Sequence, residues 1–327
     1  MLMSENPLLS AVDLRKTFKV SAQNRSTRFL TALDGVSLYL ITGETLGIAG
    51  ESGCGKSTLA KIMAGLLTPD GGSVLYKGTQ LMQLDQIDKT FFRRKTQMIF
   101  QDPFSSLNPR MRIGDSISEP FIIAGMDASS QRAELTRIMA AVGLQSDVVN
   151  RFPDEFSGGQ RQRIGIARAL AASPEILIAD EPVSSLDISI QAQIINILLQ
   201  MKREFNLSMM IVSHNLLILR HICDRIIIMY LGAIVECGPA SEIFRRCRHP
   251  YTEALIAAIP GLNASAASKG ELLRDDLPSA LSIPSGCRFH PRCRHAFDRC
   301  RHEVPDLVEY SSGHTAACHL SVQLYGK

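Results

Sequence analysis

Hydrophobic and polar positions along the chain predict short apolar strands that alternate with helices. Residues 45–49, 176–179 and 208–212 are mainly apolar runs, which are typical of strands buried on both faces of a sheet. Residues 56–67 and 186–205 instead carry apolar side chains at helical spacing. Strands and helices in this order favour an α/β fold with a mostly parallel sheet core covered on both faces.

The N-terminal and central parts of the chain depart from this alternation. Residues 9–20 and 33–40 alternate between apolar and polar positions, as half-exposed strands do. From residue 103 to about 172 the pattern is helical, with helices expected at 129–142 and 160–172. Because this helical stretch interrupts two strands of the sheet, we expect it to form a separate lobe.

The composition is that of an ordinary globular protein, and it restricts the possible partners. Of 327 residues, 45% are hydrophobic and 20% are charged. The net charge of +3 is too small to favour binding to nucleic acid or to an acidic membrane surface. Residues 1–10 show no secretory leader, and the longest apolar run, residues 226–235, is too short to span a bilayer. If the protein acts at a membrane, we expect other chains to supply the spanning helices.

A glycine-rich segment between the first buried strand and the following helix predicts a phosphate-binding loop. Its residues are Gly50, Glu51, Ser52, Gly53, Cys54, Gly55, Lys56, Ser57 and Thr58. The glycines let backbone N–H groups point inward at the helix N-terminus, where they form an anion site. In such loops the lysine reaches the β- and γ-phosphates and the next hydroxyl binds Mg²⁺, so Lys56 and Ser57 are assigned these roles. Cys54 is interpreted as a spacer, and a turn that matches by chance is the alternative.

A second candidate for the same site follows the strand at 176–179. Asp180 and Glu181 come directly after this strand. Asp180 could support Mg²⁺ through water, and Glu181 could polarise an attacking water. A strand that simply ends in acidic turn residues is the alternative interpretation. The phosphate-binding loop earlier in the chain favours the catalytic one.

A short motif before the helix at 160–172 identifies the family that this chain resembles. Ser157, Gly158 and Gly159 precede that helix and Gln160 begins it. They predict a second anion-binding helix terminus, in which Ser157 also acts as N-cap. Together with the loop and the two carboxylates, they resemble the ATP-binding cassette (ABC) ATPases over residues 9–260. The resemblance implies ATP and Mg²⁺ as ligands. It also implies an N-terminal antiparallel β subdomain, a helical subdomain at about 102–172 that carries this signature motif, and contact of the motif with ATP bound by a partner cassette.

The same resemblance implies roles for single residues elsewhere. Gln101 matches the glutamine that senses Mg²⁺ and water and couples to membrane subunits, and His214 matches the histidine that holds the γ-phosphate. Asp187 lies in the loop that crosses the dimer seam, and Phe18 stands where an aromatic ring stacks on adenine. Most relatives have Asp after the histidine, whereas this chain has Asn215. As alternatives, Phe18 could be a strand core residue and Gln101 an ordinary polar loop residue.

The C-terminal part resembles the dipeptide/oligopeptide importer ATPases, whose relatives also carry nickel or other small solutes. The segments that carry this resemblance are residues 104–110, 248–255 and 281–293. It implies a paralogous ATPase as partner, two membrane permeases, and an extracytoplasmic solute-binding protein. It also implies a peripheral position on the cytoplasmic face of a bacterial inner membrane. We expect an ATPase domain at 1–260 and a C-terminal domain at 261–327, with a linker at 263–270.

Half of the eight cysteines crowd into the last 41 residues, together with five of the eight histidines. These cysteines are Cys287, Cys293, Cys300 and Cys318, and the histidines are His290, His295, His302, His314 and His319. In a reducing compartment metal ligation is favoured over disulfides. Four thiolates suit a [4Fe–4S] cluster, which the resemblance also implies, with neighbouring arginines to offset its charge. Zinc, held by three or four of the thiolates, with or without a histidine, is the alternative.

Two other functions compete with a transport ATPase. A soluble cassette ATPase of DNA repair or translation is disfavoured, because only 55 residues separate Gln101 from Ser157, too few for an inserted coiled coil, and the chain has one cassette. The cysteine-rich tail could in addition be a metal- or redox-sensing module that regulates transport.

Overall fold

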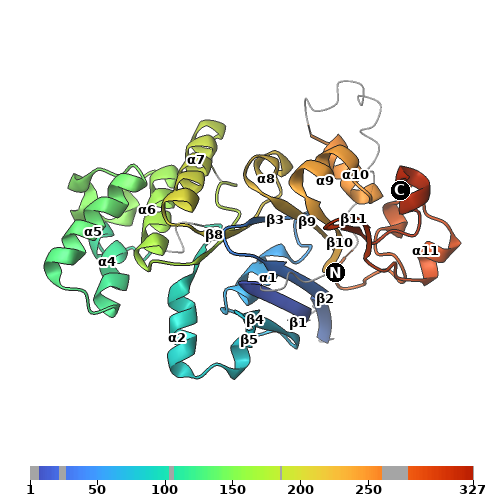
Figure 1. Cartoon of the computed structure of the whole chain (residues 1–327), viewed down its shortest axis with the longest axis horizontal. Coiled ribbons are helices and arrows are strands. Elements are labelled where there is room, and N and C mark those ends of the chain that lie inside the picture. The colour runs from blue at the N-terminus through green and yellow to red at the C-terminus, as the bar shows by residue number, and fades with distance from the viewer. Residues whose placement is uncertain (1–6, 22–26, 103–106, 185, 260–278, 327) are drawn as a thin grey trace. The chain divides into compact units, whose positions relative to one another are not determined.

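The structure is a computed structural model that describes residues 7–21, 27–102, 107–184, 186–259 and 279–326 (Figure 1). The chain divides into two compact units. Unit 1 comprises residues 1–41, 45–83 and 213–327, and unit 2 comprises residues 42–44 and 84–212. Residues 104–106 of the importer-like segment and the predicted linker at 263–270 lie outside the described residues.

The N-terminal part of unit 1 is the expected antiparallel β subdomain. Its four strands pair in the order β2-β1-β4-β5 and are β1 (Leu9–Ser21), β2 (Thr27–Leu40), β4 (Gly71–Tyr76) and β5 (Thr79–Gln80). Pairing of β1 with β2 continues to Ser21 and Thr27, so β2 begins earlier than the pattern at 33–40 predicts. Alternation decides which face is buried: Leu14 and Leu38 are in the core, while Phe29 is 55% exposed.

The rest of unit 1 is a mixed five-stranded arrangement in the order β11-β12-β10-β9-β3. Its strands are β3 (Thr45–Ala49), β9 (Arg225–Tyr230), β10 (Ala233–Pro239), β11 (Val308–Ser311) and β12 (His314–Ala316). Only β3 and β9 pair in parallel, and the other pairs are antiparallel. The parallel core expected from the sequence is therefore extended by three antiparallel strands.

Helices of unit 1 connect these strands, and two short ones lie in the C-terminal tail. They are α1 (Lys56–Met63), α8 (Leu216–Ile222), α9 (Ala240–Arg246), α10 (Pro250–Ala257), α11 (Asp298–His302) and α12 (Ser321–Tyr325). The apolar run at 226–235 is a hairpin, because Leu231 and Gly232 both have positive φ, of 43° and 77°, as a tight two-residue turn requires. No helix among the described residues is long and apolar enough to cross a membrane.

Unit 2 contains a buried parallel sheet and the expected helical insertion. The strands pair in the order β8-β7-β6 and are β6 (Thr96–Ile99), β7 (Ile176–Asp180) and β8 (Ser208–Val212). Helices α2 (Gln86–Lys95) and α7 (Ile188–Glu204) flank these strands in the chain. Every residue of β7 and β8 is buried, which explains why both read as continuous apolar runs.

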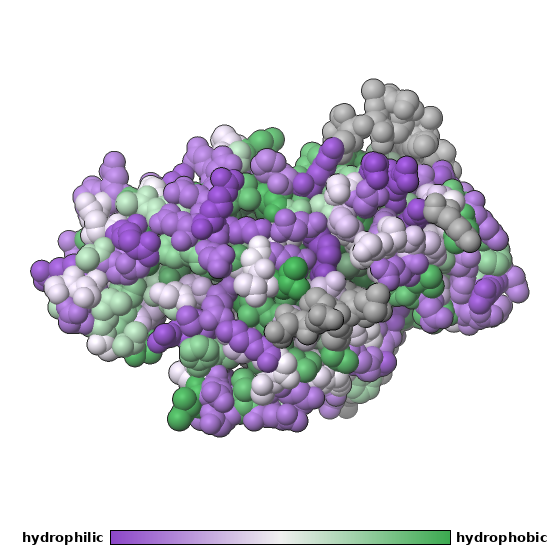
Figure 2. All heavy atoms as spheres, in the orientation of Figure 1, coloured by the Kyte–Doolittle hydropathy of each residue, from purple (hydrophilic) through white to green (hydrophobic). Residues whose placement is uncertain are grey.

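The insertion between β6 and β7 is a small helical core. Helices α4 (Ile113–Ile123), α5 (Ala128–Ala141) and α6 (Gly158–Ala171) pack against one another (Figure 1). Ile117, Phe121, Ile138 and Ile164 are at most 2% exposed and fill the space between these helices. Helices α5 and α6 confirm the predicted helices at 129–142 and 160–172. On the face of the molecule shown in Figure 2, most side chains are hydrophilic, and smaller hydrophobic areas lie between them.

Candidate nucleotide site and C-terminal thiol pocket

The glycine-rich segment of unit 1 connects β3 to α1 in the curled conformation that a phosphate-binding loop requires. Gly50, Gly53 and Gly55 have positive φ values of 148°, 79° and 107°. A Cβ atom at Gly50 would lie 2.3 Å from the Met229 carbonyl oxygen, and one at Gly55 would lie 2.2 Å from the Ala32 carbonyl oxygen. Both positions therefore exclude any other residue, because backbone from other strands lies directly against the loop.

Lys56 is buried and holds the loop around its ammonium group. Its Nζ donates hydrogen bonds to the carbonyl oxygens of Gly50 at 2.7 Å and Glu51 at 2.8 Å. Ser57 and Thr58 lie in the first turn of α1, at the helix end where backbone N–H groups point outward. Cys54 is fully buried, and this burial raises the pKa of its thiol. A buried, protonated thiol is a poor nucleophile, in agreement with its interpretation as a spacer.

The loop also has a partner that the sequence did not indicate. Arg292, in the cysteine-rich tail, forms a two-pronged ion pair with Glu51, with Nη1 to Oε2 at 2.7 Å and Nη2 to Oε1 at 3.1 Å. The hydroxyl of Tyr251 accepts a hydrogen bond from the Glu51 N–H at 2.9 Å. No local pattern could have revealed these contacts, because the two members of the ion pair are 241 positions apart.

In unit 2 the structure brings together two of the predicted catalytic residues. Asp180 is the last residue of β7 and is 3% exposed. Glu181 follows it with a φ of 47°, and its N–H donates to the Val212 carbonyl at 2.9 Å. Gln101 Nε2 donates to Glu181 Oε2 at 3.2 Å. The unusual backbone at Glu181 aims this carboxylate from the carboxyl end of a parallel strand, where ligands of such sheets bind.

The signature motif starts helix α6 with a reciprocal pair of hydrogen bonds. Ser157 Oγ accepts from the Gln160 N–H at 3.4 Å, and Gln160 Oε1 accepts from the Ser157 N–H at 3.0 Å. This capping box confirms the predicted N-cap. A Cβ atom at Gly159 would lie only 2.5 Å from Ile190 Cγ2, so glycine lets the first turn of α7 approach. Asp187 is exposed at the N-cap position of α7.

His214 and Phe18, both in unit 1, remain accessible. His214 is exposed, and the next residue, Asn215, caps helix α8 by accepting a hydrogen bond from the Leu217 N–H at 3.0 Å. Asparagine and aspartate cap helices equally well, so asparagine at this position keeps the cap intact. The Phe18 side chain is 37% exposed on β1. The alternative interpretation of Phe18 as a core residue is therefore wrong, and its role in stacking on adenine stays a prediction.

The four tail cysteines share one pocket in unit 1. The pocket is lined by Cys287, Cys293, Cys300 and Cys318, with three of the five tail histidines, His290, His295 and His319. Burial, with the nearby thiols adding to it, raises the pKa of Cys287 to about 12 and that of Cys318 to about 11. Among the described residues no group of three or more His, Cys, Asp or Glu side chains is close enough to hold a metal ion.

The remaining tail histidines and the arginines do not line this pocket. His314 is buried beside Glu236, with Nε2 2.8 Å from Oε1, and His302 lies on the surface next to Asp298. Four of the five tail arginines pair with carboxylates, in the ion pairs Arg288–Asp34, Arg292–Glu51, Arg294–Glu253 and Arg299–Glu303. These four arginines thus have carboxylate partners within unit 1, and a role in offsetting the charge of a cluster stays a prediction.

The other four cysteines, Cys54, Cys223, Cys237 and Cys247, are scattered along the sequence, which is typical of cysteines that act as small core residues. Cys54, Cys223 and Cys237 are buried, which confirms this expectation for three of them. Cys247 is only partly buried, although burial still raises the pKa of its thiol to about 12. These thiols are scattered through unit 1 and do not line the pocket of the tail.

Comparisons with known proteins agree with the nucleotide site and with the separate character of the C-terminal region. Residues 33–184 match the family described as ABC transporter, and residues 235–300 match the oligopeptide/dipeptide transporter C-terminal region. A probable peptide ABC transporter ATP-binding protein of Sinorhizobium fredii is 46% identical over 96% of this chain and 90% of its own length. The dipeptide transport ATP-binding protein DppF of Escherichia coli is 43% identical over 96% of this chain and 94% of its own. A solved dimer of the ATP-binding cassette MJ0796 with ADP and phosphate, 29% identical, aligns with a TM-score of 0.63 over 71% of this chain and 98% of its own.

Proposed function

The chain belongs to the ABC transporter family of ATPases, and from this premise we propose that it powers the uptake of dipeptides or oligopeptides. The observation that carries the proposal is the match of residues 235–300 to the C-terminal region of peptide transporters, in a chain that resembles peptide-import subunits over its full length. Hydrolysis of ATP to ADP and phosphate would supply the energy for transport.

The residues of the proposed nucleotide site divide the work between binding and hydrolysis. Lys56 and the N–H groups of the loop bind the phosphates, and Ser57 with the buried Asp180 would hold Mg²⁺, which neutralises phosphate charge when bound. Glu181 accepts a proton from the attacking water. Gln101 orients the Glu181 carboxylate through the hydrogen bond between the two side chains. His214 contacts the γ-phosphate.

We further propose that the site is completed by a second cassette. The signature residues Ser157, Gly158, Gly159 and Gln160 would contact ATP held by the partner, and Asp187 would lie at the seam. The position of the motif supports this role, because it begins the 14-residue helix α6, whose N-terminal end attracts anions. The related cassette MJ0796 is described as a dimer. A paralogous ATPase as the second cassette follows the pattern of peptide importers.

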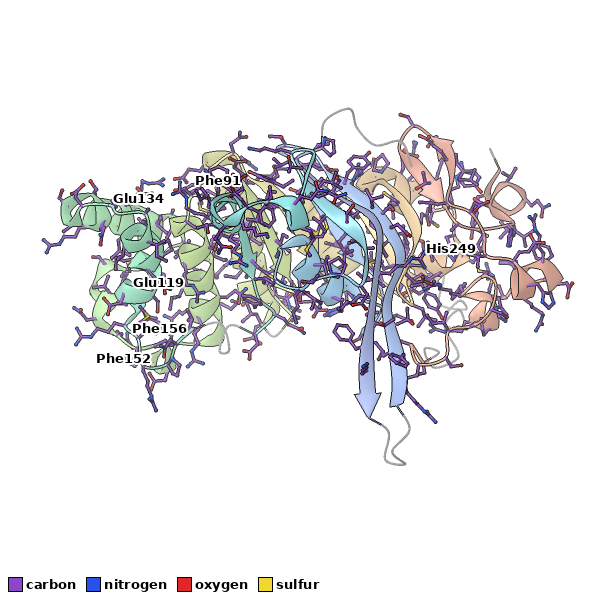
Figure 3. All side chains as sticks on the ribbon, turned by 90° about the horizontal axis from the view of Figure 1, so that it is seen from below. Phe91, Glu119, Glu134, Phe152, Phe156 and His249 are labelled. Carbon is purple, nitrogen blue, oxygen red and sulfur yellow. The ribbon has the colours of Figure 1, made fainter. Side chains whose placement is uncertain are left out.

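Two membrane permeases are the further partners that we propose, at the cytoplasmic face of a bacterial inner membrane. Large apolar side chains on two helices of unit 2 support a docking surface. Ile87 and Phe91 on α2 are 79% and 45% exposed, and Ile122 and Ile123 on α4 are 63% and 74% exposed. Phe91 is labelled in Figure 3. Exposed apolar side chains of this size are typical of surfaces that bind partners. An extracytoplasmic binding protein would deliver the solute.

A Glu181→Gln variant tests the hydrolytic assignment. ATP binding should persist, while turnover in the assembled complex should fall about 10²–10⁴-fold, because the general base is lost. Glu175→Gln is a matched control, because Glu175 immediately precedes the other end of β7. Turnover by Glu181→Gln at the rate of the control would contradict the role of Glu181 as base.

Uptake measurements separate the proposed solute from the alternatives. Cells without this chain should lose uptake of dipeptides or longer peptides and keep uptake of nickel. Loss of nickel uptake alone would assign the chain to the nickel-carrying relatives. Unchanged uptake of all three, with an ATPase that is active without membranes, would favour the soluble cassette ATPase.

For the tail we propose that the four thiols bind a [4Fe–4S] cluster, with zinc as the alternative. The shared pocket supports the proposal, because cysteines up to 31 positions apart converge on it in an apolar setting. Binding would require the thiols to move closer together and to lose their protons. A metal- or redox-sensing role for the tail would depend on the cluster or zinc ion bound by these thiols.

The test of the tail is its metal content. Protein purified without oxygen should contain iron and sulfide, and Cys300→Ser should lose them. Cys247→Ser, which changes a cysteine outside the pocket, should retain them. Zinc in place of iron would establish the alternative, and equal metal content in all three proteins would exclude the pocket as the site.

A further inference from the structure

The ion pair between Glu51 and Arg292 joins the phosphate-binding loop to the tail of the same unit. Both nitrogens of the Arg292 fork bond to the two oxygens of Glu51, the arrangement that gives arginine–carboxylate pairs their strength and direction. The Arg292 side chain is 4% exposed, whereas the Glu51 side chain is 24% exposed. Glu51 is thus held on a buried cation and cannot turn freely within the loop.

A cluster of aromatic rings fixes Arg292 in this position. Tyr230, Tyr251 and Phe289 contact one another, with ring centroids 4.7 to 5.4 Å apart. Arg292 lies over the Tyr230 ring, 5.9 Å from its centroid, and also bonds to its hydroxyl. Tyr251, which belongs to the same cluster, accepts a hydrogen bond from the Glu51 N–H through its hydroxyl. The tail therefore reaches the loop through Arg292, and rings from β9, α10 and the tail support this arginine.

The charge of Glu51 is a difficulty for a loop that binds a triphosphate. Its main-chain carbonyl already accepts a hydrogen bond from Lys56, the cation that serves the phosphates. Released from Arg292, the Glu51 carboxylate would repel the phosphates and compete with them for the Lys56 ammonium group. Within the described part of the tail, no other arginine forms an ion pair with the loop, and Arg294, two positions on, pairs with Glu253.

We propose that Arg292 is a positioning residue of the ATP site, which neutralises the Glu51 carboxylate and holds it away from the phosphates. The tail is on this view a part of the nucleotide site and not an independent appendage. The proposal rests on the proposed function of the loop as the ATP site. It concerns the loop of this chain and does not depend on what the thiol pocket binds.

The test measures the affinity of the full-length chain for Mg²⁺-ATP by titration calorimetry, with Glu181→Gln present in every variant to stop hydrolysis. Arg292→Ala should raise the Kd about tenfold, which corresponds to about 1.4 kcal/mol. Arg294→Ala, the matched control two residues away, should change the Kd less than about twofold. Arg292→Lys should lie between them, because it keeps the charge and loses the two-pronged geometry.

A second substitution separates charge from packing. If Arg292 acts through Glu51, Glu51→Gln combined with Arg292→Ala should restore the affinity to within about threefold of the parent, because no carboxylate is left to repel the phosphates. A tail that merely packs on the loop would show no such rescue. Circular dichroism at the temperature of the titration verifies that each variant is folded.

The outcomes distinguish this inference from the proposed site itself. Parent-like affinity in Arg292→Ala, or a double variant as weak as Arg292→Ala, overturns the role of Arg292. Lys56→Ala should abolish binding. If it binds ATP like the parent, the loop is not the site and the proposed function fails as well. If Lys56→Ala fails to bind and Arg292→Ala binds normally, only the positioning role is lost.

Discussion

Replacing Gly159 by alanine should destabilise unit 2 through one steric contact. Gly159 is in the first turn of α6, and a Cβ atom there would lie 2.5 Å from Cγ2 of Ile190 in α7. Carbon atoms in contact are normally about 3.5–4.0 Å apart, so one side must move by roughly 1 Å. Ile190 is β-branched and has little freedom to rotate within its helix.

The size of the effect follows from two opposing contributions. Overpacking of this kind costs about 1–3 kcal/mol, while alanine in a helix gains about 0.5–1 kcal/mol over glycine. We therefore expect Gly159→Ala to lower the free energy of unfolding by about 1 kcal/mol, the difference between the middle values of the two ranges. In an Ile190→Ala background the clash is absent and only the helical gain remains. The same substitution should then stabilise the protein by about 0.5–1 kcal/mol.

The quantity to measure is the change in the free energy of unfolding caused by Gly159→Ala, which should reverse its sign between the two backgrounds. The chain has no tryptophan, so urea unfolding is followed by far-ultraviolet circular dichroism, in the four combinations of residues at these two positions. Equal effects of Gly159→Ala in both backgrounds would refute the reasoning, because the cost would then not arise from Ile190. A stabilising effect in the parent would show that α7 yields without strain.

Three further predictions concern unit 1. Asp70 accepts hydrogen bonds from Lys16 and Thr17, which lower its pKa to about 2. Asp70→Asn should therefore lower the Tm at pH 7, and the difference in Tm between variant and parent should vanish as the pH falls through about 2. Glu236 is fully buried and accepts hydrogen bonds from two backbone N–H groups, so Glu236→Ala should cost about 3 kcal/mol or more in urea unfolding, and an unchanged midpoint would contradict this. Cys54 should escape alkylation in the native protein and react only after unfolding, as read by mass spectrometry.

Much of the nucleotide site could be predicted because its parts are local. The loop of Gly50 and Gly55 needs positive φ values that glycine supplies, and the apolar run before Asp180 can only be a buried strand in this context. The N-cap role of Ser157 likewise depends on residues within one helical turn. Such features are encoded within a few positions, so the chemistry of each residue predicts them.

Other features could not be predicted because they depend on distant partners. The apolar run at 226–235 looked like one segment, yet Leu231 and Gly232 make it a hairpin. His314 was counted with the tail cysteines, but burial beside Glu236 removes it from their pocket. In both cases a neighbouring strand, and not the local pattern, decides the outcome.

By itself the sequence determined the family, the type of fold and the residues of the phosphate-binding loop, because short-range spacing and backbone preference are sufficient for these. Only the tertiary structure decided which charged side chains form ion pairs with one another. Arg292 belongs by sequence to a basic, cysteine-rich tail, and in the folded chain it is the buried partner of Glu51. A buried cation must find a carboxylate to offset its desolvation, and packing of the whole unit determines which carboxylate is within reach.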